Sequence, residues 1–450
     1  MNPAGSWKPS LFNTFLYQQG RYYCFNSRSS ALFSLEPREY HLLAECLREL
    51  EQGGNNYRPG IYDLLAQNSF IVPSHIDEYE QEHQLFLKSK ADMAWAFLAL
   101  VPTLACNLRC SYCFQRQTPW PEPMNEKIQE RVLAVFSELA PKVRGIAVHW
   151  FGGEPLLALK TIETLSEKFH QFASEQGIRY VAEMTTNGAL LNPATLERLQ
   201  KLHLVKMEMS LDGLPESYSL RKGLPLAKAR EFYQFLYKSA EPLLHAVRKL
   251  IIRINVDREN VHEAQEFVLR MKQECPVAAR IGFRIQILST GKGLIECIPH
   301  KCYAADEVYG IEMDFKKFLA AEGLRVYGLP QRLDHPCMAV RKYAFTIDPA
   351  GNIGKCVPAT GLTTSSFFSL NSPASGSILE ELEASAQPYA AFDPFESDIC
   401  RHCHFLPICL GQCPRDHEEG AFTCNRKVKF EAELPFYDQV DPSLLQVNFR

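Results

Sequence analysis

The sequence lacks three features that would place it in a specialised class. No stretch of about 18 uninterrupted apolar residues occurs, so no helix is expected to span a bilayer. The net charge is only −4, from 48 Lys and Arg against 52 Asp and Glu, so no positive field is expected to collect nucleic acids or anionic membranes. The first 15 residues have no basic segment followed by a long apolar run, which predicts no secretion signal and a cytoplasmic location.

What the 450-residue chain does have is 15 cysteines. At roughly 100–200 residues per domain, the length predicts two to four domains. The composition, with 46% hydrophobic and 22% charged residues, is typical of a folded globular protein. An odd number of cysteines without an export signal favours metal binding or redox chemistry over disulfides.

Residues 1–90 have the pattern of a small winged-helix-like module. Its expected elements are three strands (residues 12–17, 21–25 and 31–35), two helices (36–52 and 60–68) and a final strand (69–73). An acidic stretch over 76–84 is interpreted as a linker that closes the module.

Residues 91–310 alternate strand and helix. Six expected strands lie at residues 96–103, 146–151, 180–186, 205–211, 249–256 and 281–288. This alternation predicts an α/β fold with a parallel sheet, in the form of a partial (β/α)6 TIM-like barrel. Chemistry in such folds lies at the carboxyl ends of the strands. Residues 311–450 have weaker apolar periodicity and many cysteines, so this segment is expected to need metal for its stability.

Three cysteines stand close together after the first strand of the second segment. Cys106, Cys110 and Cys113 have the spacing C-x3-C-x2-C. Three thiolates on one loop can hold a four-iron cluster by three corners, which leaves one iron free to chelate a small molecule. A zinc site is one alternative, but zinc prefers four ligands and no fourth Cys or His lies nearby in the sequence. Three ordinary buried thiols are the other alternative.

The run CNLRCSYC resembles the signature of the radical S-adenosylmethionine (SAM) enzymes, including the aromatic Tyr112 before the third cysteine. The resemblance covers most of residues 95–290. It implies a [4Fe–4S] cluster on the three cysteines, whose open iron chelates the amino and carboxylate groups of SAM. Cleavage of SAM then gives a 5′-deoxyadenosyl radical that abstracts hydrogen from an unactivated C–H bond, so the resemblance implies a radical SAM oxidoreductase.

A second motif of that family follows the second strand. Gly152, Gly153, Glu154 and Pro155 match its GGEP motif, which contacts the methionine amino group of SAM. The chemistry suits this contact, because glycines let a ligand approach the backbone closely and a carboxylate pairs with an ammonium group.

Three further residues are expected to contact the cofactor. Ser210, at the end of the fourth strand, lies where relatives contact the ribose or carboxylate of SAM, and Arg221 lies where many relatives pair an arginine with the carboxylate. Tyr112 is placed with them through the cysteine signature. Before Arg221 the sequence reads Tyr218-Ser219, where the family usually has His-Asp.

Seven cysteines of the last segment resemble the SPASM domain in order and spacing. The resemblance implies two auxiliary [4Fe–4S] clusters with interleaved ligands, so that the protein would hold three clusters in all. One set is Cys400, Cys403, Cys409 and Cys424, and the other is Cys337, Cys356 and Cys413. Zinc ribbons also use C-x2-C, but seven thiolates in tetrahedral zinc sites leave three over.

The set of three cysteines is one ligand short. A non-cysteine ligand such as Asp334 or His335 would fill the gap, or an open iron would bind a substrate thiolate or another peptide group. Cys297 and Cys302 are further candidates for the gap, although ordinary thiols are the favoured interpretation of these two. Cys24, Cys46 and Cys275 lie in apolar runs and are expected to be core residues.

The resemblance implies a peptide substrate. SPASM relatives mostly modify peptides, and residues 1–90 resemble the module with which ribosomal-peptide (RiPP) maturases bind a leader peptide to a strand edge, for which residues 14–25 are the candidate. The predicted function is a peptide maturase that forms a thioether or carbon–carbon link or excises a backbone unit, with flavodoxin or ferredoxin as electron donor. Neither nucleic acid nor membrane is an expected partner.

Two alternatives stay open. One is an enzyme resembling the anaerobic sulfatase maturases, which oxidise Cys or Ser to formylglycine. The other is an iron–sulfur electron-transfer protein or a zinc-structured interaction protein, which would have no use for a GGEP motif beside C-x3-C-x2-C. The spacing of Asp and Glu residues singles out no general base.

Overall fold

Two compact units make up the protein, for which the structure is a computed structural model. It describes residues 6–53, 58, 60–113, 115, 122–289, 301–304, 307–327, 330–360, 366–372, 376–420, 422, 424 and 426–446. The first unit combines residues 1–91, 326–337 and 392–450, and the second combines 92–325 and 338–391. These units join segments that lie far apart in the sequence, and the domain boundaries expected near residues 90 and 310 stay predictions.

A nine-stranded sheet forms the centre of the second unit, in the order β11-β10-β9-β8-β7-β6-β13-β14-β15. Its strands are β6 (Trp95–Leu100), β7 (Gly145–Trp150), β8 (Arg179–Thr186), β9 (Leu204–Leu211), β10 (Lys249–Val256), β11 (Gly282–Ile287), β13 (Ala344–Ile347), β14 (Asn352–Gly354) and β15 (Ser366–Ser369). The first six are parallel and match the six predicted strands, which confirms the α/β fold class. β13 pairs in parallel with β6, while β14 and β15 add antiparallel pairs.

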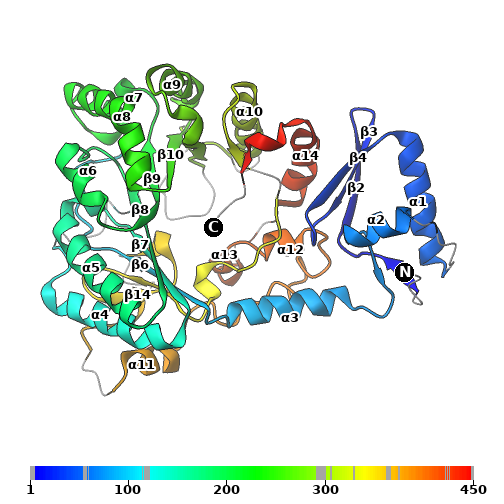
Figure 1. The fold of residues 1–450 in the computed structure, drawn as a ribbon, viewed down its shortest axis with the longest axis horizontal. Coiled ribbons are helices and arrows are strands. Elements are labelled where there is room, and N and C mark those ends of the chain that lie inside the picture. Colours follow the sequence, from blue (N-terminus) through cyan, green and yellow to red (C-terminus); the bar gives the residue numbers. More distant parts are fainter. Residues whose placement is uncertain are drawn as a thin grey trace. The chain divides into compact units, whose positions relative to one another are not determined.

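The second unit also contains helices, several of which pack along one face of the sheet (Figure 1). They are α4 (Glu126–Leu139), α5 (Leu159–Glu175), α6 (Pro193–Leu199), α7 (Pro215–Lys222), α8 (Leu226–Ala246), α9 (Val261–Glu274), α10 (Val308–Ala321) and α11 (Ile378–Ala384). Short 3₁₀ turns lie at Ala140–Lys142, Pro155–Ala158, Ala278–Arg280, Met338–Val340 and Val357–Ala359. The caps explain two of the helix starts, because Asn125 and Asn192 accept hydrogen bonds from the first turns of α4 and α6.

The two faces of the parallel strands differ in polarity. On the helix-covered face Val148, Met207 and Ile252 are fully buried. Along each strand, side chains of the opposite face alternate with those of the helix-covered face, and the opposite face is partly open to solvent. We call it the inner face, and its side chains include Ala99, His149, Glu183, Lys206, Glu208, Ser210, Arg253, Asn255 and Arg284.

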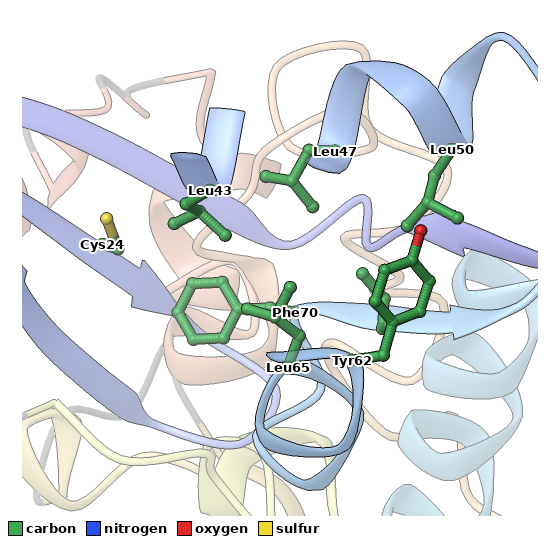
Figure 2. Close-up of a cluster of buried hydrophobic side chains, with 8 residues drawn as sticks. Cys24, Leu43, Leu47, Leu50, Tyr62, Leu65 and Phe70 are labelled. Carbon is green, nitrogen blue, oxygen red and sulfur yellow. The ribbon is translucent and has the colours of Figure 1, made fainter. Parts of the chain in front are cut away.

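The first unit begins with a three-stranded antiparallel sheet and two helices. Its elements are β2 (Asn13–Gln18), β3 (Arg21–Asn26), β4 (Ala31–Leu35), α1 (Pro37–Glu51) and α2 (Ile61–Gln67), and β1 (Trp7–Pro9) pairs with β5 (Ile71–Pro73). Figure 2 shows the core between sheet and helices, where Leu43 and Leu47 of α1 and Leu65 of α2 gather around Phe70. The predicted strands and helices of this module are all present.

The acidic stretch that the sequence suggested as a linker is a helix, so that interpretation was wrong. α3 (Glu78–Lys90) begins after Asp77, whose side chain accepts a hydrogen bond from the Glu80 amide. Two of its glutamates are buried because they have partners. Glu78 accepts from the Ser10 hydroxyl (2.7 Å), and Glu82 pairs with Arg28 (2.9 Å).

The cysteine-rich segment packs on the other face of the three-stranded sheet. Tyr23 and Phe25 of β3 lie in one apolar cluster with Phe405, Phe430 and Leu434. The elements of this segment are α12 (Leu406–Cys409), α13 (Pro414–Glu418), α14 (Arg426–Gln439), a 3₁₀ turn at Pro442–Leu444, and β12 (Val326–Tyr327) paired with β16 (Leu445–Gln446). Both faces of the sheet are therefore covered, and within the described residues β2 and β4 are its edge strands.

Two simpler expectations can also be compared with the structure. Cys24, Cys46 and Cys275 are buried, with exposures of 0%, 0% and 1%, which confirms their place in the core. In the part of the chain that the structure describes, no helix is long and apolar enough to cross a membrane.

Candidate active site

The three-cysteine loop follows β6 and is fastened to the end of α7. The Arg109 amide donates to the Lys222 carbonyl (2.8 Å), and the Ser111 amide donates to the carbonyl of the next residue back, Arg221 (3.3 Å). None of the three thiols forms a disulfide. Cys106 is exposed, whereas Cys110 is partly buried. The loop is thus held in place by its backbone, and its thiols remain available as ligands.

The glycine pair after β7 packs directly on the chain that leads into the cysteine loop. The Gly153 amide donates to the Thr103 carbonyl (3.2 Å). A Cβ atom at Gly153 would lie only 2.3 Å from the carbonyl oxygens of Leu104 and Ala105, and Gly152 has a φ of +130° that side chains rarely adopt. Both positions therefore require glycine for this close backbone contact.

Gly153→Ala is expected to push the glycine loop away from the cysteine loop. The clash involves backbone atoms that cannot rotate aside, so we expect a loss of about 1–3 kcal/mol in the free energy of unfolding. Formation of 5′-deoxyadenosine should fall with it. Gly310→Ala in α10 is the control, because its Cβ meets nothing within 4 Å. Equal melting temperatures for the two variants would contradict the account.

Glu154 is buried and holds the ends of two strands together. Its carboxylate accepts hydrogen bonds from the Thr186 hydroxyl (2.7 Å), the Asn187 amide (2.8 Å) and the Leu156 amide (3.0 Å). Burial raises its pKa, and these donors oppose the rise. The side-chain amide of Asn187 in turn donates to Asn107 in the cysteine loop (2.9 Å). The glutamate predicted as a cofactor contact thus also fixes the frame of the site.

Tyr112 is the centre of a polar cluster built from four segments. Its hydroxyl donates to Asp212 after β9 (2.5 Å) and accepts from Lys222 of α7 (3.1 Å) and Asn255 of β10 (3.1 Å). Burial and the neighbouring Asp212 carboxylate raise the pKa of Tyr112 far above its ordinary value. The tyrosine is therefore a neutral hydrogen-bonding residue that ties the cysteine loop to the sheet.

Arg221 joins this cluster and keeps hydrogen-bond donors in reserve. It donates to Asp257 (2.7 Å), its Nε lies 3.4 Å from Asp212, and its guanidinium carbon is 5.4 Å from the Tyr112 ring centre. Among the described residues, its buried Nε and Nη2 have no hydrogen-bond partner. A buried cation with unused donors is the group that would receive a carboxylate such as that of SAM. Ser210 is also buried, at the end of β9.

Three charged residues of the site were not predicted from the sequence. Asp212, Lys222 and Asp257 are almost fully buried, with exposures of 0%, 2% and 4%. Asp212 and Lys222 are next to the predicted Ser210 and Arg221, so a search for charged residues flanking the motifs would have found them. Tyr218 replaces the usual family histidine and donates its hydroxyl to the Asn187 carbonyl (2.9 Å).

The donor set at the cysteine loop fits an iron–sulfur cluster. Thiolate is the ligand that such clusters take, and the three cysteines lie on one short loop beside Arg221. Among the described residues, no three His, Cys, Asp or Glu side chains converge as ligands of one metal ion.

Four C-terminal cysteines line one pocket in the first unit. Its walls include the predicted set Cys400, Cys403, Cys409 and Cys424. Cys413, which the interleaved pattern assigns to the other set, is not among its lining residues. The structure thus brings together the four cysteines that the spacing groups.

The chain reverses between Cys409 and Cys413. Leu410, Gly411 and Gln412 have φ angles of 47°, 76° and 64°, three left-handed residues in a row. A Cβ at Gly411 would lie 2.5 Å from Cβ of Pro394, so glycine is required there. This turn separates Cys409 from Cys413, and their assignment to different sets stays a prediction.

Burial favours the protonated form of two pocket thiols, Cys403 and Cys409, in the absence of a ligand. It raises the pKa of Cys409 to about 12, although the nearby Arg426 opposes the rise. Burial also raises the pKa of Cys403, and the nearby Lys427 opposes this rise. Metal binding would displace these protons, because thiolate is the form that binds metal.

The set of three cysteines draws on both units. Cys337 and Cys413 belong to the first unit and Cys356 to the second. Its candidate extra ligands, Asp334 and His335, are exposed residues of the first unit. The second auxiliary cluster and its open position therefore stay predictions.

Known sequences resemble this chain in the region of the site. The sequence pattern of the Radical SAM superfamily matches residues 100–268. GTP 3′,8-cyclase of Desulforamulus reducens is 29% identical over 228 residues, which are 49% of this chain and 63% of the cyclase. Radical SAM cyclopropyl synthase TigE of Paramaledivibacter caminithermalis is 24% identical over 40% of this chain and 41% of the synthase. The chain thus spans less than two thirds of these relatives.

Two solved structures have a similar fold. The structure of anSMEcpe with bound AdoMet has a TM-score of 0.56 at 18% identity. This match covers 76% of this chain and 96% of the anSMEcpe chain. Streptococcus suis SuiB bound to S-adenosylmethionine has a TM-score of 0.52 at 15% identity. This match covers 92% of this chain and 97% of the SuiB chain. A further structure shows SuiB bound to the precursor peptide SuiA. Another shows anSMEcpe bound to AdoMet and a Cp18Cys peptide. At these identities the likeness shows a shared fold, a mixed α/β partial barrel.

Proposed function

We propose that the protein is a maturase of a ribosomally made peptide, built on the segment 100–268 that matches the Radical SAM superfamily. The observation that carries the proposal is the extent of the fold likeness. SuiB, which binds a precursor peptide, covers 92% of this chain, whereas anSMEcpe covers 76%. A peptide-binding module in addition to the radical SAM domain would account for this difference.

The residues around Tyr112 would bind and orient the cofactors. Cys106, Cys110 and Cys113 would hold the [4Fe–4S] cluster, and Arg221 would receive the SAM carboxylate with its unused donors. When bound, cluster and SAM supply the reductive cleavage that yields a hydrogen-abstracting 5′-deoxyadenosyl radical. The glycine loop, packed against residues 103–105, would offer its backbone to the SAM amino group.

The C-terminal pocket would hold an auxiliary cluster. Four thiols are the ligand number of a fully coordinated [4Fe–4S] cluster, and four cysteines line this pocket. Such a cluster would accept an electron from the substrate. A flavodoxin or ferredoxin would supply the electron that starts each turnover. A second auxiliary cluster on Cys337, Cys356 and Cys413 completes the proposed cofactor set.

The N-terminal sheet would bind the leader of the precursor peptide at its β2 edge. Among the described residues β2 pairs with β3 on one side only, and its Phe15 and Tyr17 are 36% and 58% exposed. The Tyr17 ring lies 4.7 Å from that of Tyr22, which in turn stacks on Tyr40 at 3.7 Å. An open backbone edge beside aromatic side chains suits an extended peptide that adds a strand.

Tyr17→Ser is expected to weaken binding of the precursor peptide about tenfold, because an aromatic anchor at a strand edge carries much of such an interface. Fluorescence anisotropy with the labelled peptide measures this. SAM cleavage without peptide should not change. Leu85→Ser on α3 is the control, because Leu85 is also an exposed apolar residue (40%) but lies outside β2. Equal losses for the two variants would contradict leader binding at β2.

The alternative of a formylglycine-forming enzyme has the fold likeness to anSMEcpe in its favour. It gives no role to the N-terminal sheet.

A different class of protein, a zinc-structured interaction protein, is distinguished from the proposed enzyme by its metal content. The proposal expects brown protein with about 12 irons per chain after anaerobic purification. Colourless protein with stoichiometric zinc would contradict it.

A further inference from the structure

A second group of charged side chains lies on the inner face and takes no part in the cluster around Tyr112. Glu208 of β9 accepts hydrogen bonds from Arg253 of β10 (2.9 Å) and from Arg284 of β11 (2.6 Å). The strand register places Arg253 beside both Ser210 and Arg284. The group therefore spans three neighbouring strands, with Ser210 of the expected cofactor site at its border.

These three side chains leave one positive charge uncompensated. Burial disfavours the charged form of Glu208, but the two arginines outweigh it and hold the pKa of this carboxyl below its ordinary value. Glu208 is thus ionised at neutral pH and balances one guanidinium. Among the described residues, no other acid lies within ion-pair distance of either arginine. The nearby Lys206 and Glu183 form their own pair.

Both arginines also hold donors in reserve. The Nε atoms of Arg253 and Arg284 are buried and have no hydrogen-bond partner in the described part of the chain. The side chains are nevertheless 24% and 37% exposed, so a ligand can reach the exposed part of each guanidinium side chain. Leaving buried donors without an acceptor is unfavourable, which favours binding of an anion at these side chains.

We propose that Arg253 and Arg284 bind a carboxylate group of the substrate on the inner face. The planar guanidinium fork matches a carboxylate in shape and charge. The inference rests on the proposed function, because a peptide carries carboxylates on Asp and Glu side chains and at its C-terminus. Arg253 lies two residues before Asn255, roughly 7 Å along the strand. The site would hold the substrate close to the cofactor residues without using them.

Small acidic probes test this on the intact, anaerobically purified protein with SAM present. N-acetyl-aspartate N-methylamide carries a side-chain carboxylate, N-acetylalanine a terminal one, and N-acetyl-asparagine N-methylamide neither. Saturation-transfer NMR should show binding of at least one acidic probe, with a dissociation constant of about 1 mM or weaker, and no binding of the neutral one. The acidic probe that binds identifies the source of the carboxylate.

Variants assign the binding to these arginines. Arg253→Gln and Arg284→Gln are expected to weaken binding of the acidic probe about tenfold. Arg253→Lys, which keeps the charge but loses the planar fork, should weaken it less than Arg253→Gln. Arg270→Gln on α9, an arginine 58% exposed that pairs with Glu274, is the control and should change nothing. If Arg253→Gln does not fold, the more exposed Arg284 still provides the test.

Three results would overturn the inference. They are equal binding of the neutral probe, unchanged affinity in both glutamine variants, and a raised KM for SAM in peptide-free cleavage, which would assign the arginines to SAM instead. A failure of the proposed function is visible separately. A co-expressed precursor peptide that stays unmodified would contradict the maturase assignment, while the probes would still bind.

Discussion

Cys110→Ala is expected to abolish formation of 5′-deoxyadenosine from SAM. Cys110 is the middle ligand of the three-cysteine loop, and two thiols cannot hold a four-iron cluster at three corners. The loop itself should keep its position, because it is fastened through backbone hydrogen bonds to the end of α7. Iron content should therefore fall by about four per chain, with little change in the circular dichroism spectrum. Chromatography of the reaction with SAM and dithionite measures the product.

Cys275→Ala is the matched control for this variant. Cys275 is also a buried cysteine of the second unit, at the end of α9, but it lies in the apolar core. Its replacement should lower stability modestly and leave both iron content and SAM cleavage intact. SAM cleavage that survives Cys110→Ala would refute the assignment of the cluster ligands.

Cys403→Ala is expected to separate the two halves of the proposed chemistry. Cys403 lines the C-terminal pocket and packs against the apolar cluster around Phe405. Its loss should remove about four irons per chain and lower the melting temperature of the protein. SAM cleavage without peptide should continue, because Cys403 belongs to the other compact unit from the three-cysteine loop. Modification of the precursor peptide should be lost.

Cys46→Ala provides the comparison within the same unit. Cys46 is buried on α1 and has no place in the pocket, so its replacement should leave iron content unchanged. Unchanged iron in Cys403→Ala would show that the pocket holds no cluster.

Local patterns were enough to predict the central sheet. Each of the six parallel strands is a short apolar run bounded by turn residues, and each expected strand was found in the sheet. Motifs at strand ends identified the region of the site because parallel strands carry their carboxyl ends to the same edge. The cysteine loop and the glycine pair do meet there, in direct backbone contact.

What the sequence did not show depends on partners far along the chain. The acidic stretch before residue 90 reads as a solvated linker until Arg28 and Ser10 are seen to pair with its glutamates. Likewise, β13 joins β6 across more than 200 residues, which no local period can signal. The roles of Asp212 and Lys222 appear only once Tyr112 lies between them.

The most direct measurement is the mass of a candidate precursor peptide, taken from any small open reading frame beside the gene for this protein, after co-expression with the intact enzyme. The account predicts a changed mass, with a loss of about two mass units for a cross-link and a larger loss for excision of a backbone unit. Co-expression with Cys110→Ala should return the unmodified peptide. An unmodified peptide alongside wild-type protein that cleaves SAM would contradict the central claim.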